Sequence, residues 1–304
     1  MKSEIEAYVL HRQTEGANAL SIKAYRSQLR IFERYLTLTN TGGLHTLTRS
    51  MIEDFLYAMA TNLNPQGAYT SERIRRTFFT VRCFFTYLEK KNQIIRNPAV
   101  GVQPPKPHKL LRDNYFTLDE MQDFFRRLPS ETDKEKRNRM LFLLSYCAGL
   151  RLNEACNVKK TDINFESNTL YVAEAKGSSG GGVPLCRYIT YALREHLDCA
   201  AQSATQTEYL FIGRGNAPIS RDAAMDAFNN AVKSLGFTRY LTFHSLRKSI
   251  GRHLLESGLS VRYVQRFLRH KNINSTELYT HAGMRQLQSM VMRFHPGEQN
   301  EAVY

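Results

Sequence analysis

The chain has 304 residues, a length that predicts about two domains and is sufficient to bury two hydrophobic cores. Hydrophobic residues make up 42% of it and charged residues 23%, which excludes a largely disordered chain and a collagen-like or coiled-coil one. No apolar run comes near the roughly 18 residues that a membrane-spanning helix needs, and the N-terminus is acidic where a signal peptide would be apolar. We therefore expect a folded, cytoplasmic protein without a membrane partner.

Basic residues outnumber acidic ones in both halves of the chain. Lys and Arg number 42 against 28 Asp and Glu, for a formal net charge of +14 at pH 7. Residues 1–105 contain 14 basic and 8 acidic side chains, and residues 106–304 contain 28 and 20. A polyanion that contacts both halves explains this distribution, and nucleic acid is the polyanion to expect in a cytosol. The alternative is that the surplus charge only keeps the protein in solution.

The sequence lacks the usual patterns of metal and cofactor sites. Its five cysteines are odd in number and share no C-x-x-C spacing, so we expect reduced thiols, with neither a disulfide framework nor a metal site. It contains no G-x-x-x-x-G-K-[ST], G-x-G-x-x-G or H-E-x-x-H motif. We therefore expect no cofactor.

Residues 1–104 predict a helical domain. Two apolar stripes with helical spacing and one shorter helix are expected there. The stripes are Tyr25, Leu29, Phe32, Leu36 and Ile74, Phe78, Val81, Phe85, Leu88, and the shorter helix covers Met51–Ala60. Four arginines lie off the second stripe, namely Arg73, Arg75, Arg76 and Arg82. They are candidate DNA-binding residues, because arginines on a helix face contact phosphates, but a solvated helix face would look the same.

Residues 97–114 contain four prolines and no helical periodicity, so we place a linker at 105–114. The second domain, residues 115–304, predicts mixed structure. Helices are expected from about Thr117 and over 135–148, 221–235, 244–257 and 260–269, and a strand pair between 168–175 and 182–185. The expected fold class is mainly α, with a small β-sheet in the second domain.

Two pairs of polar residues in the second domain could carry chemistry. His244 and Arg247 are three residues apart, which places both on one face of a helix. A guanidinium binds two oxygens of one phosphate, and an imidazole moves a proton near neutral pH. Arg151 follows an apolar helix, and Glu154 comes three residues later. Taken alone, His244 and Arg247 could equally lie on a solvent-exposed helix face. Arg151 and Glu154 could equally form a structural ion pair.

Six segments together indicate a family. They are A-G-L-R-L-N-E-A, E-A-K-G…G-V-P-L, H-S-L-R, L-L-E-S-G, L-R-H and Y-T-H, and their order and spacing resemble the tyrosine recombinase (phage-integrase-like) family. The resemblance covers nearly the whole chain and is strongest to the short, Xer-like or transposon-type members. It implies a helical core-binding domain and an α+β catalytic domain that form a clamp around DNA. We expect no extra N-terminal arm-site domain of the kind found in larger phage integrases.

The resemblance also implies a role for each reactive residue. Tyr279 would be the nucleophile that forms a 3′-phosphotyrosine, and Arg151 and Arg247 would hold the non-bridging phosphate oxygens. Lys176 would protonate the leaving 5′-oxygen, His244 would assist proton transfer at the tyrosine, and His270 would hydrogen-bond the phosphate. Glu154 would support the first arginine. The covalent bond conserves energy, so strand joining would need no ATP.

The implied function is site-specific DNA recombination through a Holliday junction, carried out by a homotetramer on double-stranded DNA with specific sites. Integration, excision and dimer resolution all remain open, as does the need for accessory proteins or a partner recombinase. A type IB topoisomerase, which shares the chemistry, and a non-catalytic DNA-binding descendant are the alternatives.

The chain departs from the family pattern at three places and ends in a further helical stripe. Lys248 stands where many members have a second histidine, Arg269 stands where glycine is common, and the turn after Lys176 is S-S-G-G-G rather than basic. The terminal stripe is Met284, Leu287, Val291 and Phe294. It could fold back onto its own domain, or, as the resemblance suggests, dock as a C-terminal helix into a neighbouring protomer.

Overall fold

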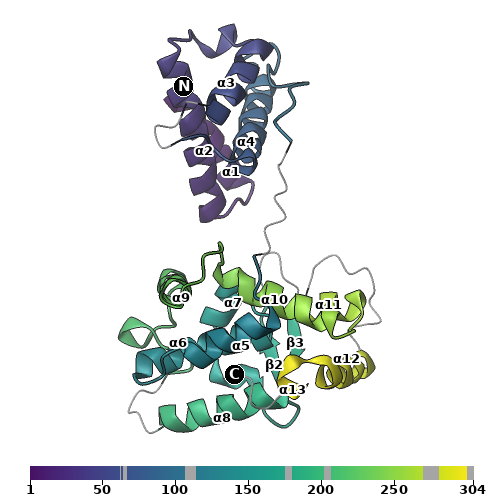
Figure 1. Ribbon diagram of the computed structural model, residues 1–304. Coiled ribbons are helices and arrows are strands. Elements are labelled where there is room, and N and C mark those ends of the chain that lie inside the picture. Colours follow the sequence, from purple (N-terminus) through teal and green to yellow (C-terminus); the bar gives the residue numbers. More distant parts are fainter. Residues whose placement is uncertain are drawn as a thin grey trace. The chain divides into compact units, whose positions relative to one another are not determined.

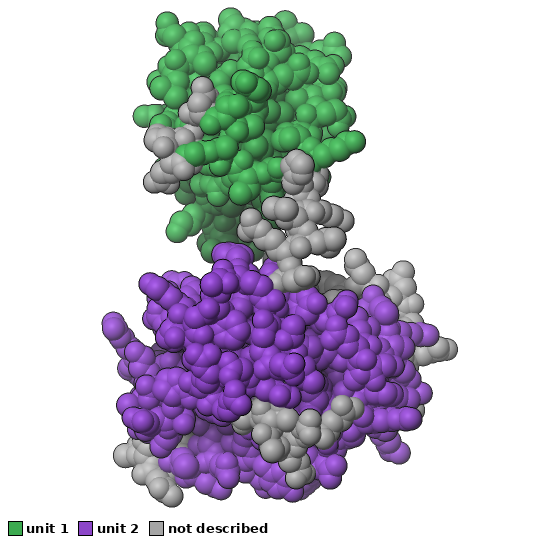
Figure 2. Space-filling view, viewed as in Figure 1, with its two compact units in different colours: residues 1–111 green, residues 112–304 purple. Residues whose placement is uncertain are grey.

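The computed structural model describes residues 1–61, 63, 67–106, 114–174, 180–201, 207–269 and 281–299. The chain divides into two compact units, Met1–Leu111 and Arg112–Tyr304, and each has a hydrophobic core of its own (Figures 1 and 2). None of the helices in these ranges combines the length and apolarity that crossing a lipid bilayer requires.

The described part of the first unit is helical. Its elements are α1 (Lys2–Thr14), α2 (Ala19–Leu38), α3 (Arg49–Thr61) and α4 (Ser71–Lys90), with a 3-10 turn at Leu44–Thr46. Helix α2 packs against α1 and α4, and α3 packs against α4. The packing buries the apolar stripes of α2 and α4 against each other, which is the arrangement that amphipathic helices favour.

Local sequence signals explain where these helices begin. The Thr70 side chain caps α4 by accepting a hydrogen bond from the backbone N–H of Arg73 at 3.3 Å. Asn18 caps α2 in the same way, with Ser21 as the donor at 2.8 Å. The sequence did not predict α1, because only Ile5, Tyr8 and Val9 of its 13 residues are buried and they make no extended stripe.

The second unit is mainly helical with a small antiparallel sheet, as expected for the fold class. Its elements are α5 (Leu118–Arg127), α6 (Asp133–Cys147), α7 (Leu152–Cys156), β1 (Ile163–Asn164), β2 (Thr169–Val172), β3 (Gly181–Pro184), α8 (Arg187–Ala201), α9 (Arg221–Ser234), α10 (Phe243–Glu256), α11 (Val261–Phe267), α12 (His281–Phe294) and α13 (Pro296–Gln299). Short 3-10 turns cover Lys160–Asp162 and Arg214–Asn216. The strand order is β1-β2-β3, and buried Leu170 pairs with buried Val183.

Helix α6 is the centre of this unit. Every residue from Met140 to Cys147 is buried, and α6 packs against α7, α8, α9 and α10. The C-terminal half of this helix is therefore buried on all sides, which is typical of a position inside a core. The helix ends where Gly149 adopts a left-handed backbone with φ of 56°. This turn directs the chain into Arg151 and α7.

Helices α7, α8 and α13 of the second unit were not predicted, whereas the terminal stripe forms a helix, α12, as expected. Helix α8 was missed, although Ile189 and Leu193 are fully buried and four residues apart. Of the terminal stripe, Leu287 and Val291 are buried in the core of their own unit, where α12 packs against β3 and α11. The described tail therefore folds back onto its own unit, and contact with a neighbouring protomer stays a prediction.

Candidate active site

Three segments of the second unit bring arginines around one carboxylate. Glu154 lies in the first turn of α7, Arg247 lies in α10, and Arg269 follows α11 (Figure 1). Arg151 is the N-cap residue of α7. All three arginines lie within ion-pair distance of Glu154, whose side chain is only 4% exposed.

Glu154 holds Arg151 through both carboxylate oxygens. The Arg151 side chain donates from Nη1 to Oε1 at 2.8 Å, and its backbone N–H donates to Oε2 at 2.9 Å. The Arg151 side chain remains 30% exposed. The supporting role expected for Glu154 is thus consistent with a guanidinium that is fixed from behind and still reaches solvent.

Arg247 is almost completely buried, and two backbone carbonyls fix its side chain. Its Nη1 donates to the carbonyl oxygen of Gly149 at 2.6 Å, and its Nη2 donates to the carbonyl oxygen of Leu268. Nη1 also lies 3.8 Å from Oε2 of Glu154. Burial, together with the positive charge of Arg151, lowers the pKa of Arg247 to about 9, which still leaves it charged at neutral pH.

Arg269 is a member of this cluster that sequence reasoning noted only as a departure from the family pattern. Its Nη2 donates to Oε2 of Glu154 at 2.7 Å, and its side chain is 4% exposed. Its backbone is left-handed, with φ of 53°, which explains why glycine is common at this place. Burial lowers the pKa of Arg269.

The cluster carries more positive than negative charge. Three guanidinium groups surround one carboxylate, so these four side chains have a formal surplus of two positive charges. Fixed cations in a partly desolvated site stabilise an anion without any reorganisation cost, and planar guanidinium groups match the oxygens of a phosphate. The arrangement is suited to holding a phosphodiester.

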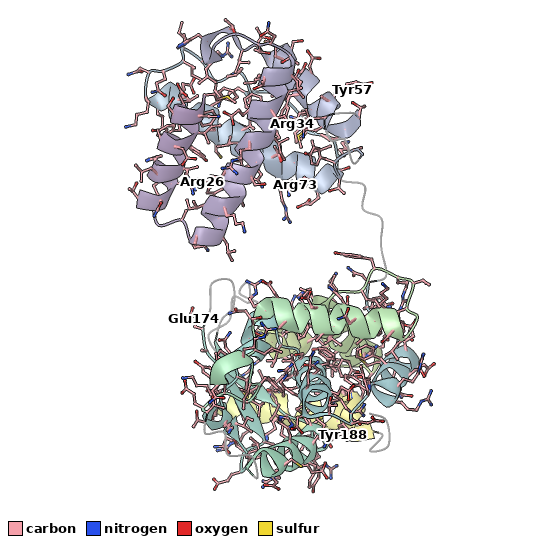
Figure 3. All side chains as sticks on the ribbon, turned by 90° about the vertical axis from the view of Figure 1, so that its left-hand side faces the viewer. Arg26, Arg34, Tyr57, Arg73, Glu174 and Tyr188 are labelled. Carbon is pink, nitrogen blue, oxygen red and sulfur yellow. The ribbon has the colours of Figure 1, made fainter. Side chains whose placement is uncertain are left out.

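The other predicted catalytic residues divide into two groups. His244 lies in the first turn of α10, is exposed, and precedes Arg247 by three residues, one helical turn. Lys176, His270 and Tyr279 lie outside the described residues. Glu174, labelled in Figure 3, is the last described residue before Lys176, and Arg269 is the last before His270.

The four predicted DNA-binding arginines are all exposed on α4. Arg73 donates to the hydroxyl of Ser27 on α2 at 3.3 Å, Arg76 pairs with Glu72 at 2.7 Å, and the Arg82 guanidinium lies 5.6 Å from the ring centre of Phe79. A shallow groove of about 430 Å³ between α2 and α4 is lined by Ser21, Ala24, Tyr25, Gln28, Glu72, Arg75, Arg76, Phe79 and Thr80. Figure 3 shows Arg73 on α4 and Arg26 and Arg34 on α2.

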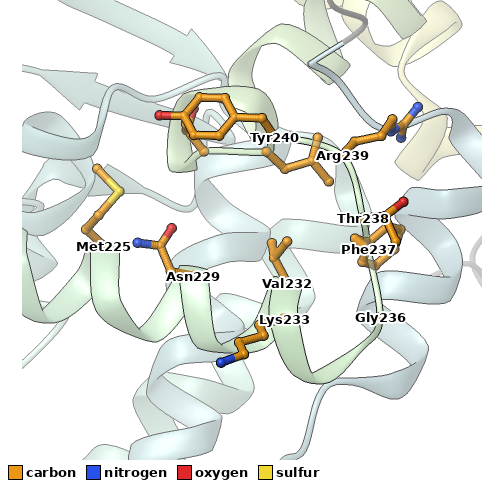
Figure 4. A pocket seen from close by; sticks show the side chains of 11 residues that line it. Met225, Asn229, Val232, Lys233, Gly236, Phe237, Thr238, Arg239 and Tyr240 are labelled. Carbon is orange, nitrogen blue, oxygen red and sulfur yellow. The ribbon is translucent and has the colours of Figure 1, made fainter. Parts of the chain in front are cut away.

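A larger hollow of about 710 Å³ lies between α9 and the segment that leads into α10 (Figure 4). Its lining includes Met225, Asn229, Lys233, Phe237 and Tyr240, and none of the clustered arginines. It is therefore separate from the arginine cluster around Glu154.

One group of possible metal ligands occurs within the described ranges. Sulfur or nitrogen atoms of Cys147, Cys186 and His295 lie within 4.8 Å of one another, and all three residues are buried. Both ring nitrogens of His295 already have backbone partners, since Nε2 contacts the carbonyl oxygen of Cys147 at 3.0 Å and Nδ1 accepts from the N–H of Gly297 at 3.0 Å. A metal ion would have to displace one of these bonds, so we interpret the group as core packing.

Comparisons with known proteins agree with this geometry. Residues 114–286, more than half of the chain, match the phage integrase family. The chain belongs to the phage integrase family. Over 282 residues it is 29% identical to the tyrosine recombinase XerC of Lacticaseibacillus casei (strain BL23), covering 91% of this chain and 92% of that protein. Over 301 residues it is 29% identical to the tyrosine recombinase XerD of Staphylococcus aureus (strain N315), covering 97% and 99%.

A solved structure within this family has the same fold. A lambda integrase tetramer bound to a Holliday junction superposes with a TM-score of 0.73 at 19% identity, over 91% of this chain and 80% of the integrase chain. The family match and the XerC and XerD relatives show that this phage integrase is a tyrosine site-specific recombinase of the Xer-like type.

Proposed function

We propose that this recombinase cleaves and rejoins DNA through a 3′-phosphotyrosine at Tyr279 and exchanges strands through a Holliday junction, as a homotetramer on double-stranded DNA with specific sites. The observation that carries the proposal is the cluster of Arg151, Arg247 and Arg269 around Glu154, with its surplus of two positive charges. A phosphodiester gathers negative charge on its non-bridging oxygens in the transition state, and preorganised guanidinium groups stabilise that charge.

The two predicted phosphate-binding arginines have different freedom to act. Arg247 is locked by the carbonyls of Gly149 and Leu268, so it supplies a fixed positive field. Arg151 is 30% exposed and held on one side by Glu154, so it can direct donors toward a bound phosphate. Together they would hold the non-bridging oxygens while the phosphorus is attacked.

The proton transfers complete the proposed reaction. The Tyr279 oxygen attacks the phosphorus, and its proton passes to His244, because a tyrosine with a pKa of about 10 is a poor nucleophile until it loses the proton. The bond to the 5′-oxygen breaks, and Lys176 gives that oxygen a proton. His270 donates a hydrogen bond to the phosphate. A 5′-hydroxyl of the partner strand then reverses these steps, which joins the exchanged strands.

The proposed DNA contacts involve both units. In the first unit, the exposed arginines of α4 beside the α2–α4 groove would contact backbone phosphates. In the second unit, the arginine cluster would bind the scissile phosphate. The lambda integrase tetramer bound to a Holliday junction, which has the same fold, supports tetramer formation and a Holliday-junction intermediate. We expect the enzyme to act on DNA in the cytoplasm.

The deciding experiment is covalent trapping on a nicked suicide substrate, which loses the short 5′-hydroxyl fragment and cannot be religated. Tyr279→Phe should abolish the protein–DNA adduct and leave DNA affinity nearly unchanged, because only the nucleophilic oxygen is removed. Tyr263→Phe is the matched control and should retain the adduct. An adduct that persists in the Tyr279 variant would contradict the assignment.

A second measurement separates recombination from relaxation. Plasmids with two target sites should yield recombinant products, and a supercoiled plasmid without a site should stay supercoiled. Relaxation of any plasmid without strand exchange would instead support the topoisomerase alternative.

A further inference from the structure

Arg269 links two parts of the cluster that are far apart in the sequence. Oε2 of Glu154 accepts from Arg269 Nη2 at 2.7 Å and from the backbone N–H of Arg151 at 2.9 Å, while Oε1 accepts from Arg151 Nη1 at 2.8 Å. One carboxylate thus joins α7 to the segment that follows α11. The next residue in that segment is His270.

We propose that Arg269 is a positioning residue for DNA cleavage, which ties the segment leading into His270 to the carboxylate that orients Arg151. The proposal rests on the proposed function, because it assigns Arg269 a part in the same reaction. It adds a residue to the site at a place where the family commonly has glycine.

The local structure indicates that Arg269 is not there for stability. Its backbone is left-handed at φ 53°, a conformation that costs an arginine more than a glycine. Its cation is buried, which lowers its pKa, and its Nε is buried without a hydrogen-bond partner among the described residues. A residue that is unfavourable in three respects is retained where it supports function.

The charge balance explains what Arg269 does for Glu154. With Arg269 present, Oε2 of Glu154 accepts from Arg269 and from the Arg151 backbone, and Oε1 accepts from the Arg151 side chain. Without Arg269, the carboxylate loses its closest partner on the α11 side and is free to turn toward Arg247, which lies 3.8 Å away. Arg151 would then lose its fixed direction, and the arginine cluster would lose one of its two surplus charges.

The test compares cleavage with binding in Arg269→Gly. Glycine accepts the left-handed backbone, which offsets part of the stability lost with the buried ion pair to Glu154, so we expect this variant to fold. DNA affinity should change little, while the single-turnover rate of adduct formation should fall by about 10- to 100-fold, the loss usual when a group that orients a reacting residue is removed. Asn168→Gly is the matched control, because Asn168 also has a left-handed backbone, at φ 46° in the turn before β2, and should cleave normally.

Chemical rescue distinguishes positioning from a structural role. Added guanidinium at a non-denaturing concentration should restore part of the cleavage rate of Arg269→Gly, and urea at the same concentration should not. Arg269→Lys should keep more activity than Arg269→Gly, because it retains the charge. A Gly variant that cleaves at the unsubstituted rate would overturn the proposal, and so would a loss of cleavage that follows a loss of folding and resists rescue. If the unsubstituted protein itself forms no adduct, the proposed function fails first.

Discussion

The carbonyl oxygen of Gly149 accepts a hydrogen bond from Arg247 Nη1 at 2.6 Å, although 98 residues separate the two in sequence. Gly149 follows the buried C-terminal half of α6, and Arg247 lies in α10, which packs against α6. The core of the second unit therefore fixes the buried arginine directly. Stability of the turn at Gly149 and the geometry of the site should be coupled.

Gly149→Ala tests this coupling. A Cβ at this position would lie 2.7 Å from Cδ2 of Leu268, whose carbonyl is the second acceptor of Arg247, and the backbone has φ of 56°. We expect the variant to lose about 1 to 3 kcal/mol of unfolding free energy from overpacking, and its cleavage rate to fall. Urea denaturation followed by fluorescence or circular dichroism measures the first effect.

Gly236→Ala is the matched control for that substitution. Gly236 also has a left-handed backbone, with φ of 79°, but an added Cβ would meet nothing within 4 Å. It should lose only the backbone contribution, about 1 kcal/mol, with normal cleavage. Equal losses of stability and activity in the two variants would contradict the coupling.

The surplus charge of the arginine cluster should make the free protein bind phosphate. Burial lowers the pKa of Arg247, and a bound anion would offset the cost of keeping that charge in the core. Inorganic phosphate at ten times its Kd should stabilise the second unit by roughly 1.4 kcal/mol, which thermal unfolding detects. Sodium chloride at matched ionic strength should have a smaller effect.

Arg151→Gln identifies where the phosphate binds. Its side chain is part-exposed, so the substitution removes one positive charge without opening a cavity in the core. The phosphate-induced stabilisation should shrink in this variant. An undiminished shift would place the bound anion elsewhere on the protein.

The stability of the second unit should fall as the pH drops below about 6.5, the ordinary pKa of histidine. Burial lowers the pKa of His253, whose Nδ1 contacts the Tyr146 hydroxyl at 2.8 Å and whose Nε2 contacts the Phe116 carbonyl oxygen at 2.9 Å. The unfolded chain then takes up a proton that the folded one does not, so acid favours unfolding until the folded pKa is reached. Burial lowers the pKa of His196 as well, so this group acts in the same direction. Against the effect of burial, the neighbouring Cys186 helps to raise the pKa of His295, which acts in the opposite direction.

Urea unfolding at a series of pH values between 7.5 and 5.5 measures this dependence. His253→Gln should lower stability at pH 7.5, because buried partners lose their bonds, and should make the pH dependence shallower. His45→Gln, in the 3-10 turn of the first unit, is the control and should leave the dependence unchanged. An unchanged slope in the His253 variant would exclude it as the source.

Periodicity and capping signals predicted most helices of this fold, because residues such as Ile74, Phe78 and Val81 form one uninterrupted apolar face. The order of the motifs predicted Arg151 and Arg247, the two residues that we propose to hold the scissile phosphate. The sequence marked Arg269 only as a departure from the family pattern. Its proposed role depends on a contact with Glu154, which lies 115 residues away in the sequence. Tertiary contacts of this kind leave no local pattern.

The C-terminal stripe shows a second limit of prediction from sequence. The stripe that includes Leu287 and Val291 predicts an apolar helix, but spacing alone does not say which surface covers it. In the structure both residues are buried in their own unit. Removal of residues 283–304 would therefore expose part of this core. A test of protomer contact is better made by removing residues 300–304 only.

Binding to DNA should depend strongly on salt, and the arginines of α4 should account for part of that dependence. Each phosphate neutralised on duplex DNA contributes about 0.9 to the slope of log affinity against log salt concentration. Arg75 is exposed and lines the α2–α4 groove, so Arg75→Ala should reduce the slope by about 0.9. Glu72→Gln should increase the slope. In the unsubstituted protein Arg76 pairs with Glu72 at 2.7 Å, and the substitution would make Arg76 available to a phosphate.

Arg49→Ala on α3 is the control and should leave the slope unchanged, because Arg49 lies on another helix and pairs with Glu53 at 2.9 Å. Fluorescence anisotropy on a labelled target duplex over a salt series measures all three, and equal slopes for the Arg75 and Arg49 variants would place the DNA-binding face of the first unit away from α4.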